Sequence, residues 1–342
     1  MHVSERHRAP VPPVPAGVAR PLWSVMIPTY NCAGYLREAL AGVLAQAPGP
    51  EVMQIEVVDD CSTADDPAAV VAELGRGRVA FHRQPRNVGH TANFRTCLER
   101  ARGELVHLLH GDDAVRDGFY RRLEAGFAAR PDVGAAFCRH TIVAESAGWE
   151  WTSELERAES GVLEGWLERI AVRQRIQTPS IAVRRAVYET LGTFDRRLSW
   201  VEDWEMWARI AAHHPVWYEV EPLAVYRVHG TSNSSRHTRS GENLRDVRRA
   251  VAIIGGYLPP ASAQAIGRRS LEAWASDALE NRVPALLREG DLHTALVQVR
   301  EALRCSRSPR VLRRLAPLLP RIAGLAARRA ARGAPSRMPH VA

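Results

Sequence analysis

The chain has 342 residues and a formal net charge of +8, and because it contains no lysine, all 46 basic side chains of the Lys and Arg class are arginine. The absence of lysine excludes Schiff-base chemistry on a lysine and a Walker-type phosphate loop, which requires one. The charge is concentrated in residues 302–342, which hold 10 Arg and no acid. The rest of the chain is nearly neutral, which argues against a protein that binds nucleic acid over its main face.

The overall composition, with 46% apolar and 25% charged residues, is typical of a soluble globular protein. No apolar run approaches the roughly 20 residues that cross a bilayer. Residues 1–21 are Pro-rich and lack the apolar region of a secretory signal, so we expect a flexible leader there. The five cysteines are scattered without a close pair, which favours a reducing, cytoplasmic location.

From residue 22 onward, short β-rich apolar runs alternate with helical periods, which predicts βα units and a mainly parallel sheet. The elements expected first are strand 23–28, helix 33–46, strand 54–58, helix 67–74, strand 78–82, helix 91–101, strand 105–109, helix 118–129 and strand 133–137. Those expected next are helix 163–173, helix 203–213 and two short strands within 216–227, divided at Pro222. Residues 233–241 predict a loop or linker, and residues 242–342 have a helical pattern throughout.

Acidic pairs follow two of the predicted strands, Asp59-Asp60 after the second and Asp112-Asp113 after the fourth. In parallel α/β sheets, ligands collect beyond the carboxyl ends of the strands. Adjacent carboxylates repel, so a cation, hydrogen bonds or solvent must offset the cost. Helix capping by Asp60, Ser62 or Asp66 remains an alternative for the first pair. Carboxylates near a histidine suit Mg²⁺ or Mn²⁺ and, through the metal, a diphosphate.

Two common enzyme motifs are absent from the sequence. A dinucleotide-binding fingerprint should follow the first strand, but residues 29–34 lack its glycine spacing. The only near match, at residues 75–80, precedes a strand instead of following one. No Gly-x-Ser-x-Gly nucleophile elbow of a serine hydrolase occurs either.

Six short sequence motifs follow one another in a recognisable order. They are VMIPTYN (25–31), EVVDDCS (56–62), NVG (87–89) with Asn93, GELVHLLHGDD (103–113), WVEDWEMW (200–207) and YRVHGTS (226–232). Each segment alone is a weak signal. In this order, over residues 22–232 and about two thirds of the chain, they resemble the family 2 glycosyltransferases of the GT-A fold.

The resemblance implies a site for a nucleotide-sugar donor, in which Asp60 accepts hydrogen bonds from the base. The implied donor-binding residues are Pro28, Tyr30, Asn31, Asp60, Asn87, Gly89 and Asp112. It also implies a Mg²⁺ or Mn²⁺ ion on Asp113, Asp112 and His229, with Asp113 as the surest ligand. This chain has His110 where the family often has Asp.

Asp203 matches the catalytic base of inverting members of that family. Sugar transfer with inversion needs a base for the proton of the attacking acceptor hydroxyl and a cation for the departing nucleoside diphosphate. Tryptophans beside Asp203 favour a partly desolvated and therefore more basic carboxylate. The alternative is a helix-terminal acid that the helix dipole stabilises. Trp200, Trp204 and Trp207 either form an acceptor platform or fill the core.

The basic tail, residues 302–342, combines leucines at helical spacing with Arg314, Arg321 and Arg328 at intervals of seven. This pattern is typical of a basic amphipathic segment on an anionic membrane surface. Alternatively, the leucines pack on the rest of the protein and the arginines are solvated. Pro317 and Pro320 predict two short helices instead of one. Nucleic-acid binding is disfavoured because no aromatic residues are interleaved.

We therefore expect a GT-A-type α/β domain over residues 22–232, with a mixed, mainly parallel sheet, followed by the helical C-terminal region. The expected activity is inverting transfer from a nucleotide-diphosphate sugar to a hydroxyl of a saccharide or lipid-linked acceptor, in cell-surface polysaccharide or glycolipid synthesis. The expected location is cytoplasmic, with membrane contact at the inner face if the tail binds lipid. The alternative is a non-catalytic module that binds sugar nucleotides on the same fold.

Overall fold

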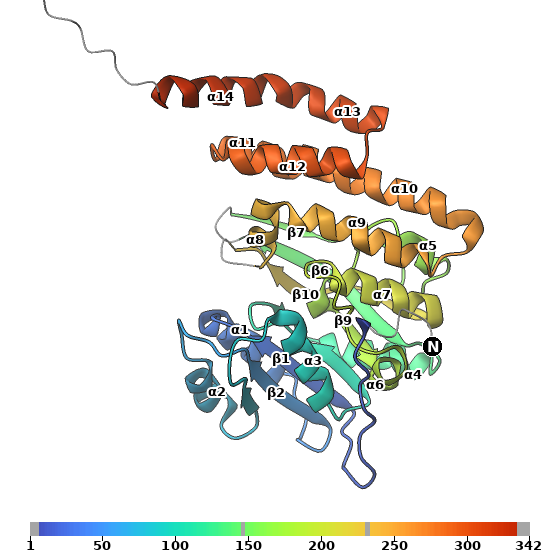
Figure 1. Cartoon of the computed structure of the whole chain (residues 1–342). Helices are drawn as coiled ribbons and strands as arrows, with labels where there is room; N and C mark the ends of the chain where they lie inside the picture. Colours follow the sequence, from blue (N-terminus) through green and yellow to red (C-terminus); the bar gives the residue numbers. More distant parts are fainter. Residues whose placement is uncertain (1–6, 145–147, 230–232, 334–342) are drawn as a thin grey trace, which may run out of the picture.

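The computed structural model describes residues 7–144, 148–229 and 233–333, which form a helix-flanked sheet with further helices stacked at one end (Figure 1). The strands are β1 (Trp23–Thr29), β2 (Met53–Asp59), β3 (Ala80–Arg83), β4 (Leu105–Leu108), β5 (Ala114–Val115), β6 (Ala135–Ala144), β7 (Trp149–Thr152), β8 (Gly161–Val162), β9 (Ile181–Arg184) and β10 (Val216–Arg227). The helices before the C-terminal region are α1 (Ala33–Leu44), α2 (Pro67–Gly75), α3 (His90–Arg100), α4 (Phe119–Ala129), α5 (Trp166–Ile170), the 3-10 turn η3 (Thr178–Ser180), α6 (Arg185–Leu191) and α7 (Glu202–His213). Those of the C-terminal region are α8 (Asn233–Ser240), α9 (Glu242–Gly255), α10 (Pro260–Asp277), the π-helical turn η4 (Ala278–Arg282), α11 (Val283–Arg288), α12 (Leu292–Cys305), α13 (Pro309–Leu315), the 3-10 turn η5 (Ala316–Leu318) and α14 (Leu319–Gly333).

The sheet has the strand order β3-β2-β1-β4-β9-β6-β10-β5, with β7 beside β6 and β8 beside β10. Strands β3, β2, β1 and β4 are parallel neighbours, and β9 is antiparallel to both β4 and β6. Strands β6 and β10 consequently point the same way as β1. The sheet is mixed with mostly parallel strands, as the sequence predicts, so the carboxyl ends of β1, β2 and β4 meet at one end of it.

Strand β10 is continuous through Pro222, so the prediction of two separate strands is wrong. Its pairing with β6 shifts register between Glu219 and Ala224. Proline lacks a backbone N–H and cannot donate to the ladder at that position. The sheet accommodates it as a local irregularity instead of ending the strand.

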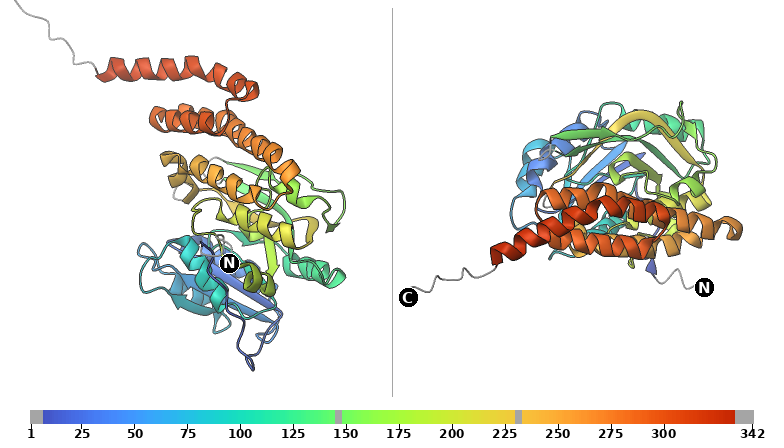
Figure 2. Two further views of the ribbon diagram at one scale, coloured as in Figure 1. Left: turned by 45° about the vertical axis from the view of Figure 1, so that its right-hand side comes forward. Right: turned by 90° about the horizontal axis from the view of Figure 1, so that it is seen from above.

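Two apolar cores lie on the two faces of the sheet. One, beneath α1, α2 and α4, contains the fully buried Leu36 and Phe119. The other includes Trp204 of α7 and continues without a break into Leu244 of α9 and Trp274 of α10. The C-terminal helices therefore share a core with the sheet domain, and Figure 2 shows them layered over one face of it.

The prediction of a loop or linker over residues 233–241 is wrong. Residues 233–240 form α8, and Gly241, with φ 74°, connects it directly to α9. The carbonyl oxygen of Thr238 accepts a hydrogen bond from Nε2 of Gln298 on α12 at 2.6 Å. The segment has no apolar period of its own, and packing against α9 and α12 stabilises the helix instead. Ser232, at the end of the last motif, lies outside the described residues.

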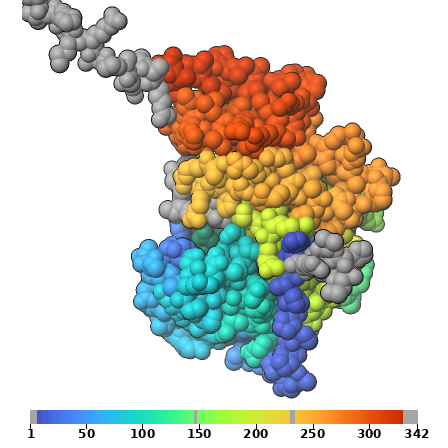
Figure 3. Space-filling model, viewed as in Figure 1, coloured from blue at the N-terminus to red at the C-terminus, as the bar shows by residue number. Residues whose placement is uncertain are grey.

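The expectation of a flexible leader does not hold for residues 7–21, which run along the surface of the domain (blue in Figure 3). Val11 is only 2% exposed. The Arg8 guanidinium pairs with Asp195 at 3.4 Å and with Glu205 of α7 at 3.1 Å. These contacts hold the segment against the domain. Its proline-rich sequence did not predict this packing. Residues 1–6 lie outside the described part of the chain.

The tail forms two helices joined by η5, as its prolines predict, and α14 packs against α11 and α12. Leu318 is buried, and Ile322 and Leu325 pack against the same core as the other C-terminal helices. Arg321 and Arg328 are exposed. Ile322 and Leu325 of α14 therefore face protein, which favours the packing alternative for them, whereas Leu319 is 54% exposed. Within the described residues, no helix combines the length and apolarity needed to span a bilayer.

Candidate active site

A cavity of about 1130 Å³ gathers the predicted site residues at the carboxyl ends of β1, β2 and β4. Nine of the ten predicted residues line the cavity. The tenth, Asp113, follows Asp112 in the chain and is only 1% exposed. The cavity continues past Asp203 to Trp200 and to Arg282 of the π-helical turn η4. A donor and an acceptor can therefore share it.

The first acidic pair is stabilised by protein groups. The carboxylate of Asp59 accepts hydrogen bonds from the backbone N–H and the hydroxyl of Ser62 and pairs with Arg83 at 3.1 Å. The helix cap in this region is Asp66, whose side chain accepts from the backbone N–H of Ala69 at the start of α2. This arrangement leaves the capping alternative without support for Asp60.

Asp60 holds the loop after β3 against the cavity. Its carboxylate accepts the backbone N–H groups of Val88 at 2.7 Å and Gly89 at 3.0 Å. Burial raises the pKa of the Asp60 carboxyl, although these two hydrogen bonds act to lower it. Both oxygens keep a second lone pair for a ligand donor. Gly89, with φ 86°, supplies a backbone conformation that side-chain-bearing residues rarely adopt.

Asn31 organises the donor side of the cavity through its side-chain oxygen. This Oδ1 accepts the backbone N–H groups of Thr63 at 2.8 Å and Ala64 at 3.0 Å, and Asn31 itself has φ 51°. Its side chain thus holds the loop between β2 and α2. The neighbouring Tyr30 is 44% exposed and presents its ring at the cavity.

A candidate metal centre lies in the turn after β4, where His110, Asp112 and Asp113 offer ligand atoms within 4.8 Å of one another. His229 joins them, because its Nε2 is 3.0 Å from Oδ2 of Asp112. Among the described residues, Nε2 of His110 and Oδ2 of Asp113 are buried without a hydrogen bond, and Oδ2 has only a 3.4 Å contact with Nδ1 of His110. Such atoms are costly to bury alone. Carboxylate oxygens with imidazole fit Mg²⁺ or Mn²⁺.

The two carboxylates of this centre differ electrostatically. Burial raises the pKa of Asp113 to about 6, and the charge of Asp112 adds to the rise. Burial acts in the same sense on Asp112, but the hydrogen bond from His229 and the charge of His110 outweigh it and lower the pKa of that carboxyl. A cation beside both would favour the ionised form of Asp113 as well.

Arg227 is a site residue that the sequence reasoning missed. Its backbone N–H donates to Oδ1 of Asp113, and its Nη1 donates to the carbonyl oxygen of Asp112, both at 2.9 Å. The guanidinium also pairs with Glu38 of α1 and lies over the ring of Tyr35, 5.4 Å from its centroid. Its position in the last motif, as the one cation in YRVHGTS, is the signal that could have identified it.

Asp203 lies in the first turn of α7 with its carboxylate held from two sides. Oδ2 accepts hydrogen bonds from Nε2 of Gln174 at 2.6 Å and from the hydroxyl of Thr178 at 3.3 Å. Oδ1 accepts the backbone N–H of Trp204 at 2.7 Å. Burial raises the pKa of Asp203 to about 7, and the neighbouring Glu202 carboxylate contributes in the same direction. The group can exchange a proton near neutral pH.

The carboxylate of Glu202 pairs with a histidine and not with its neighbour Asp203. Its Oε1 is 2.9 Å from Nε2 of His90 at the start of α3. Burial acts to raise the pKa of Glu202, but the charge of His90 and its hydrogen bond leave that pKa below the ordinary value. Glu202 is thereby ionised where Asp203 is protonated, so two adjacent carboxylates titrate apart.

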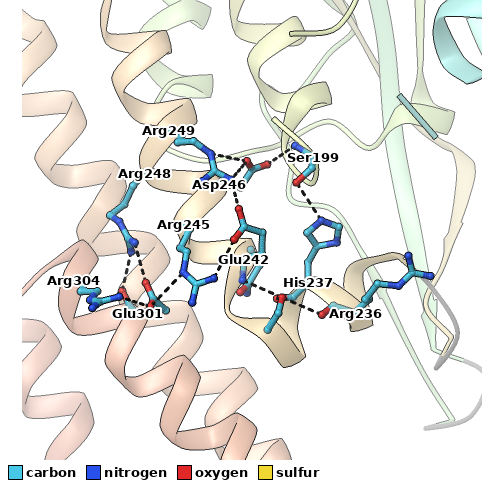
Figure 4. Close-up of polar contacts among 12 residues, drawn as sticks. Ser199, Arg236, His237, Glu242, Arg245, Asp246, Arg248, Arg249, Glu301 and Arg304 are labelled. Atoms are coloured by element: carbon cyan, nitrogen blue, oxygen red, sulfur yellow. Dashed lines mark hydrogen bonds and ion pairs between the residues drawn. The ribbon is translucent and has the colours of Figure 1, made fainter. Parts of the chain in front are cut away.

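The turn that precedes α7 is held by the C-terminal helices (Figure 4). Asp246 of α9 is fully buried, and its Oδ2 accepts the backbone N–H groups of Ser199, Trp200 and Val201 at 2.9, 2.8 and 3.2 Å. His237 of α8 adds a contact of 3.2 Å to the hydroxyl of Ser199. The helical C-terminal region thus positions the segment that carries Asp203.

Solved structures with this architecture define the class of protein. S. aureus TarS in complex with UDP-GlcNAc superposes with a TM-score of 0.62 at 19% identity, over 93% of this chain and 94% of that one. The mannosyltransferase PcManGT from Pyrobaculum calidifontis, in complex with GDP-Man and Mn²⁺, gives a TM-score of 0.54 at 19% identity, over 96% and 87%. The chain therefore has the GT-A fold.

Sequence comparison then gives the family. Residues 24–192 match the model of Glycosyl transferase family 2. An uncharacterized protein of Mycobacterium tuberculosis is 26% identical over 277 residues, 75% of this chain and 83% of that protein. An uncharacterized glycosyltransferase of Rickettsia typhi is 23% identical over 221 residues, 63% and 66% of the two chains. The resemblance to family 2 glycosyltransferases is therefore confirmed over residues 24–192, whereas the motifs at 200–207 and 226–232 lie beyond the matched segment.

Proposed function

We propose that the protein transfers a sugar, with inversion, from a nucleotide-diphosphate sugar to an acceptor hydroxyl. The observation that carries this proposal is the buried Asp203 carboxylate, with a pKa of about 7, in the same cavity as the cluster of His110, Asp112 and Asp113. A base and a cation-binding cluster in one cavity supply the two functions that sugar transfer requires.

In this mechanism, Asp203 takes the proton of the acceptor hydroxyl as its oxygen attacks the anomeric carbon from the face opposite the leaving group. The hydrogen bond from Gln174 fixes Oδ2, so the carboxylate does not have to reorient when the acceptor binds. The nucleobase and ribose lie against Tyr30, Asp60 and the loop at Gly89, all of which line the cavity.

The departing nucleoside diphosphate lies beside the metal centre. His110, Asp112, Asp113 and His229 would hold Mg²⁺ or Mn²⁺, which supplies positive charge to the diphosphate. Arg227, the basic side chain next to the cluster, adds a cation where the chain has no lysine to offer. PcManGT, with GDP-Man and Mn²⁺ in its structure, supports the same pairing of donor and metal here.

A thermal-shift panel tests the donor site. UDP-, GDP- and dTDP-sugars, each with Mn²⁺ or with EDTA, are added to the full chain, and the expected result is stabilisation by one nucleotide class that depends on Mn²⁺. Stabilisation by none of them would contradict the donor assignment. Binding without release of nucleoside diphosphate would favour the alternative of a non-catalytic binding module.

The acceptor is proposed to be a saccharide or a lipid-linked saccharide of the cell surface, reached at the inner face of the membrane. The exposed Arg321 and Arg328 on α14 support electrostatic contact with anionic lipid, while Ile322 and Leu325 are already packed against protein. Flotation with anionic vesicles should therefore weaken when both arginines are replaced by glutamine. Equal flotation of the variant and the wild type would end the membrane proposal.

A further inference from the structure

The part of the cavity beyond Asp203 is lined by an arginine cluster, which we define as Arg173, Arg175 and Arg282. These side chains come from two regions far apart in the sequence, the segment after α5 and the π-helical turn η4. None of them contacts the metal centre or the donor side in any hydrogen bond or ion pair of the described residues. The donor-binding and metal-binding roles proposed above leave this cluster unused.

Two arginines of the cluster share a single carboxylate. Nη2 of Arg173 is 2.9 Å from Oδ1 of Asp277, and Nη2 of Arg282 is 3.2 Å from Oδ2 of the same side chain. Two guanidinium charges against one carboxylate leave an excess of one positive charge at this point. Because Arg173 is 52% exposed, it is accessible to a ligand in the cavity.

Arg282 packs against two indole rings that are also in contact with each other. Its guanidinium lies 5.4 Å from the ring centroid of Trp200 and 5.8 Å from that of Trp274. Its Nη1 is buried and has no hydrogen-bond partner in the described part of the chain. An unsatisfied N–H of a charged group is costly, and an anion in the cavity would reduce that cost. π-Helical turns such as η4 are frequent at functional sites.

Arg175, which follows Gln174 in the sequence, also shares one carboxylate with a second arginine. Its Nη1 is 2.8 Å from Oε1 of Glu156, whose other oxygen pairs with Arg169. The Nε of Arg175 is buried and, among the described residues, has no hydrogen-bond partner. The exposed Glu154 also lines the cavity and is an opposing charge outside these pairs.

The sequence places this cluster next to the base. Gln174 donates to Asp203, and its neighbours on both sides are the cluster members Arg173 and Arg175. Consecutive Cα atoms are about 3.8 Å apart. Because Asp203 and the cluster line one cavity, an acceptor whose hydroxyl reaches Asp203 can extend to the guanidinium groups.

We propose that the arginine cluster is an anion subsite for a phosphate group of the acceptor. The inference rests on the proposed function, because it assigns the cavity beyond Asp203 to the acceptor. Planar guanidinium groups bind phosphate oxygens in pairs. The two arginine pairs on shared carboxylates leave two positive charges, of which Glu154 offsets one. The phosphate can belong to a phosphorylated saccharide or to a polyprenyl phosphate.

Binding of inorganic phosphate to the full chain tests the subsite, with EDTA present and potassium chloride at matched ionic strength as the reference. The readout is tryptophan fluorescence, because Trp200 and Trp274 flank Arg282. We expect saturable quenching that is weakened about tenfold or more in Arg173→Gln and Arg282→Gln. The matched control is Arg268→Gln, an exposed position on α10, which should bind like the wild type.

Three results would overturn the proposal: no saturable binding by the wild type, equal binding by Arg173→Gln, or loss of binding only in Arg227→Gln. The exposed position of Arg173 makes its variant informative even if Arg282→Gln fails to fold. Donor binding with Mn²⁺, measured on the same preparations, separates this inference from the proposed function. If donor binds and phosphate does not, only the subsite is wrong.

Competition distinguishes the two sources of phosphate. A hexose phosphate and phosphatidylcholine vesicles that carry a polyprenyl phosphate are each compared with their phosphate-free counterparts. The subsite predicts that at least one phosphorylated probe displaces inorganic phosphate while its neutral counterpart does not. Equal behaviour of every phosphorylated and neutral pair would contradict the subsite.

Discussion

Gln174 donates a hydrogen bond from Nε2 to Oδ2 of Asp203 at 2.6 Å. The bond ties the segment after α5 to the first turn of α7 and thereby fixes one oxygen of the proposed base. A hydrogen bond to the charged form of a carboxyl lowers its pKa. The bonds from the backbone N–H of Trp204 and the hydroxyl of Thr178 act in this direction against the rise that burial causes in Asp203.

Activity should rise with pH through the pKa of Asp203. Burial raises that pKa to about 7, so the carboxyl is protonated and inactive as a base below this pH and ionised above it. We expect kcat/KM to fall about tenfold per pH unit on the acid side, with a midpoint near 7. A profile flat from pH 6 to 8 would be evidence against Asp203 as the base.

Replacement of Gln174 by leucine should move this acid limb to higher pH. The variant removes the short hydrogen bond to Oδ2 and leaves the carboxylate with only the 3.3 Å contact of Thr178 on that oxygen. The pH profile of kcat/KM is the measurement, and Thr178→Val, which removes a hydrogen bond that lowers the same pKa, should shift it in the same direction. An unchanged midpoint in Gln174→Leu would mean that the contact does not tune the base.

Stabilisation by Mn²⁺ should depend on Asp113. Its Oδ2 is buried without a hydrogen bond in the described residues, so a cation that binds the cluster gains a ligand there. We expect Asp113→Ala to abolish the rise in melting temperature with Mn²⁺, and EDTA to abolish it in the wild type. Asp117→Ala, at an exposed position nearby, is the matched control. A full Mn²⁺ response in Asp113→Ala would exclude this residue as a ligand.

Asp246→Asn should destabilise the protein and lower activity although the residue is not in the cavity. The buried carboxylate accepts three consecutive backbone N–H groups before α7, and we expect a loss of about 2 kcal/mol in the free energy of unfolding. Urea titration measures it. Asp132→Asn, an exposed position paired with Arg130, should change stability by less than about 1 kcal/mol. Similar effects of both substitutions would contradict the positioning role of Asp246.

Much of the fold could be predicted from hydrophobic periodicity and from the capping residues, glycines and prolines between elements. The strands that end at Thr29 and Asp59 are almost wholly buried and mostly apolar, and the helix after Asp66 has a capping acid followed by proline. The errors fall where tertiary contacts outweigh local pattern. Residues 7–21 and α8 have no apolar period, and ion pairs of Arg8 and contacts with α12 determine their structure.

The candidate site was predictable where function requires a carboxylate after a strand or at the start of a helix, as at Asp112 and Asp203. Its partners were not, because they come from distant segments. Gln174 lies 29 residues before Asp203, and Arg227 reaches Asp112 across 115 positions. The pairing of Arg282 with Asp277 depends on a π-helical turn, which the sequence pattern does not reveal.

Release of nucleoside diphosphate from a panel of UDP-, GDP- and dTDP-sugars, with Mn²⁺ and an acceptor extract, tests the central claim most directly. Wild type should release it from at least one donor, Asp203→Asn should be slower by about 10² to 10⁴, and Asp113→Ala should lose the dependence on Mn²⁺. Release that is unchanged in both variants would contradict the mechanism. Absence of release from every donor that binds would identify a sugar-nucleotide-binding module instead of an enzyme.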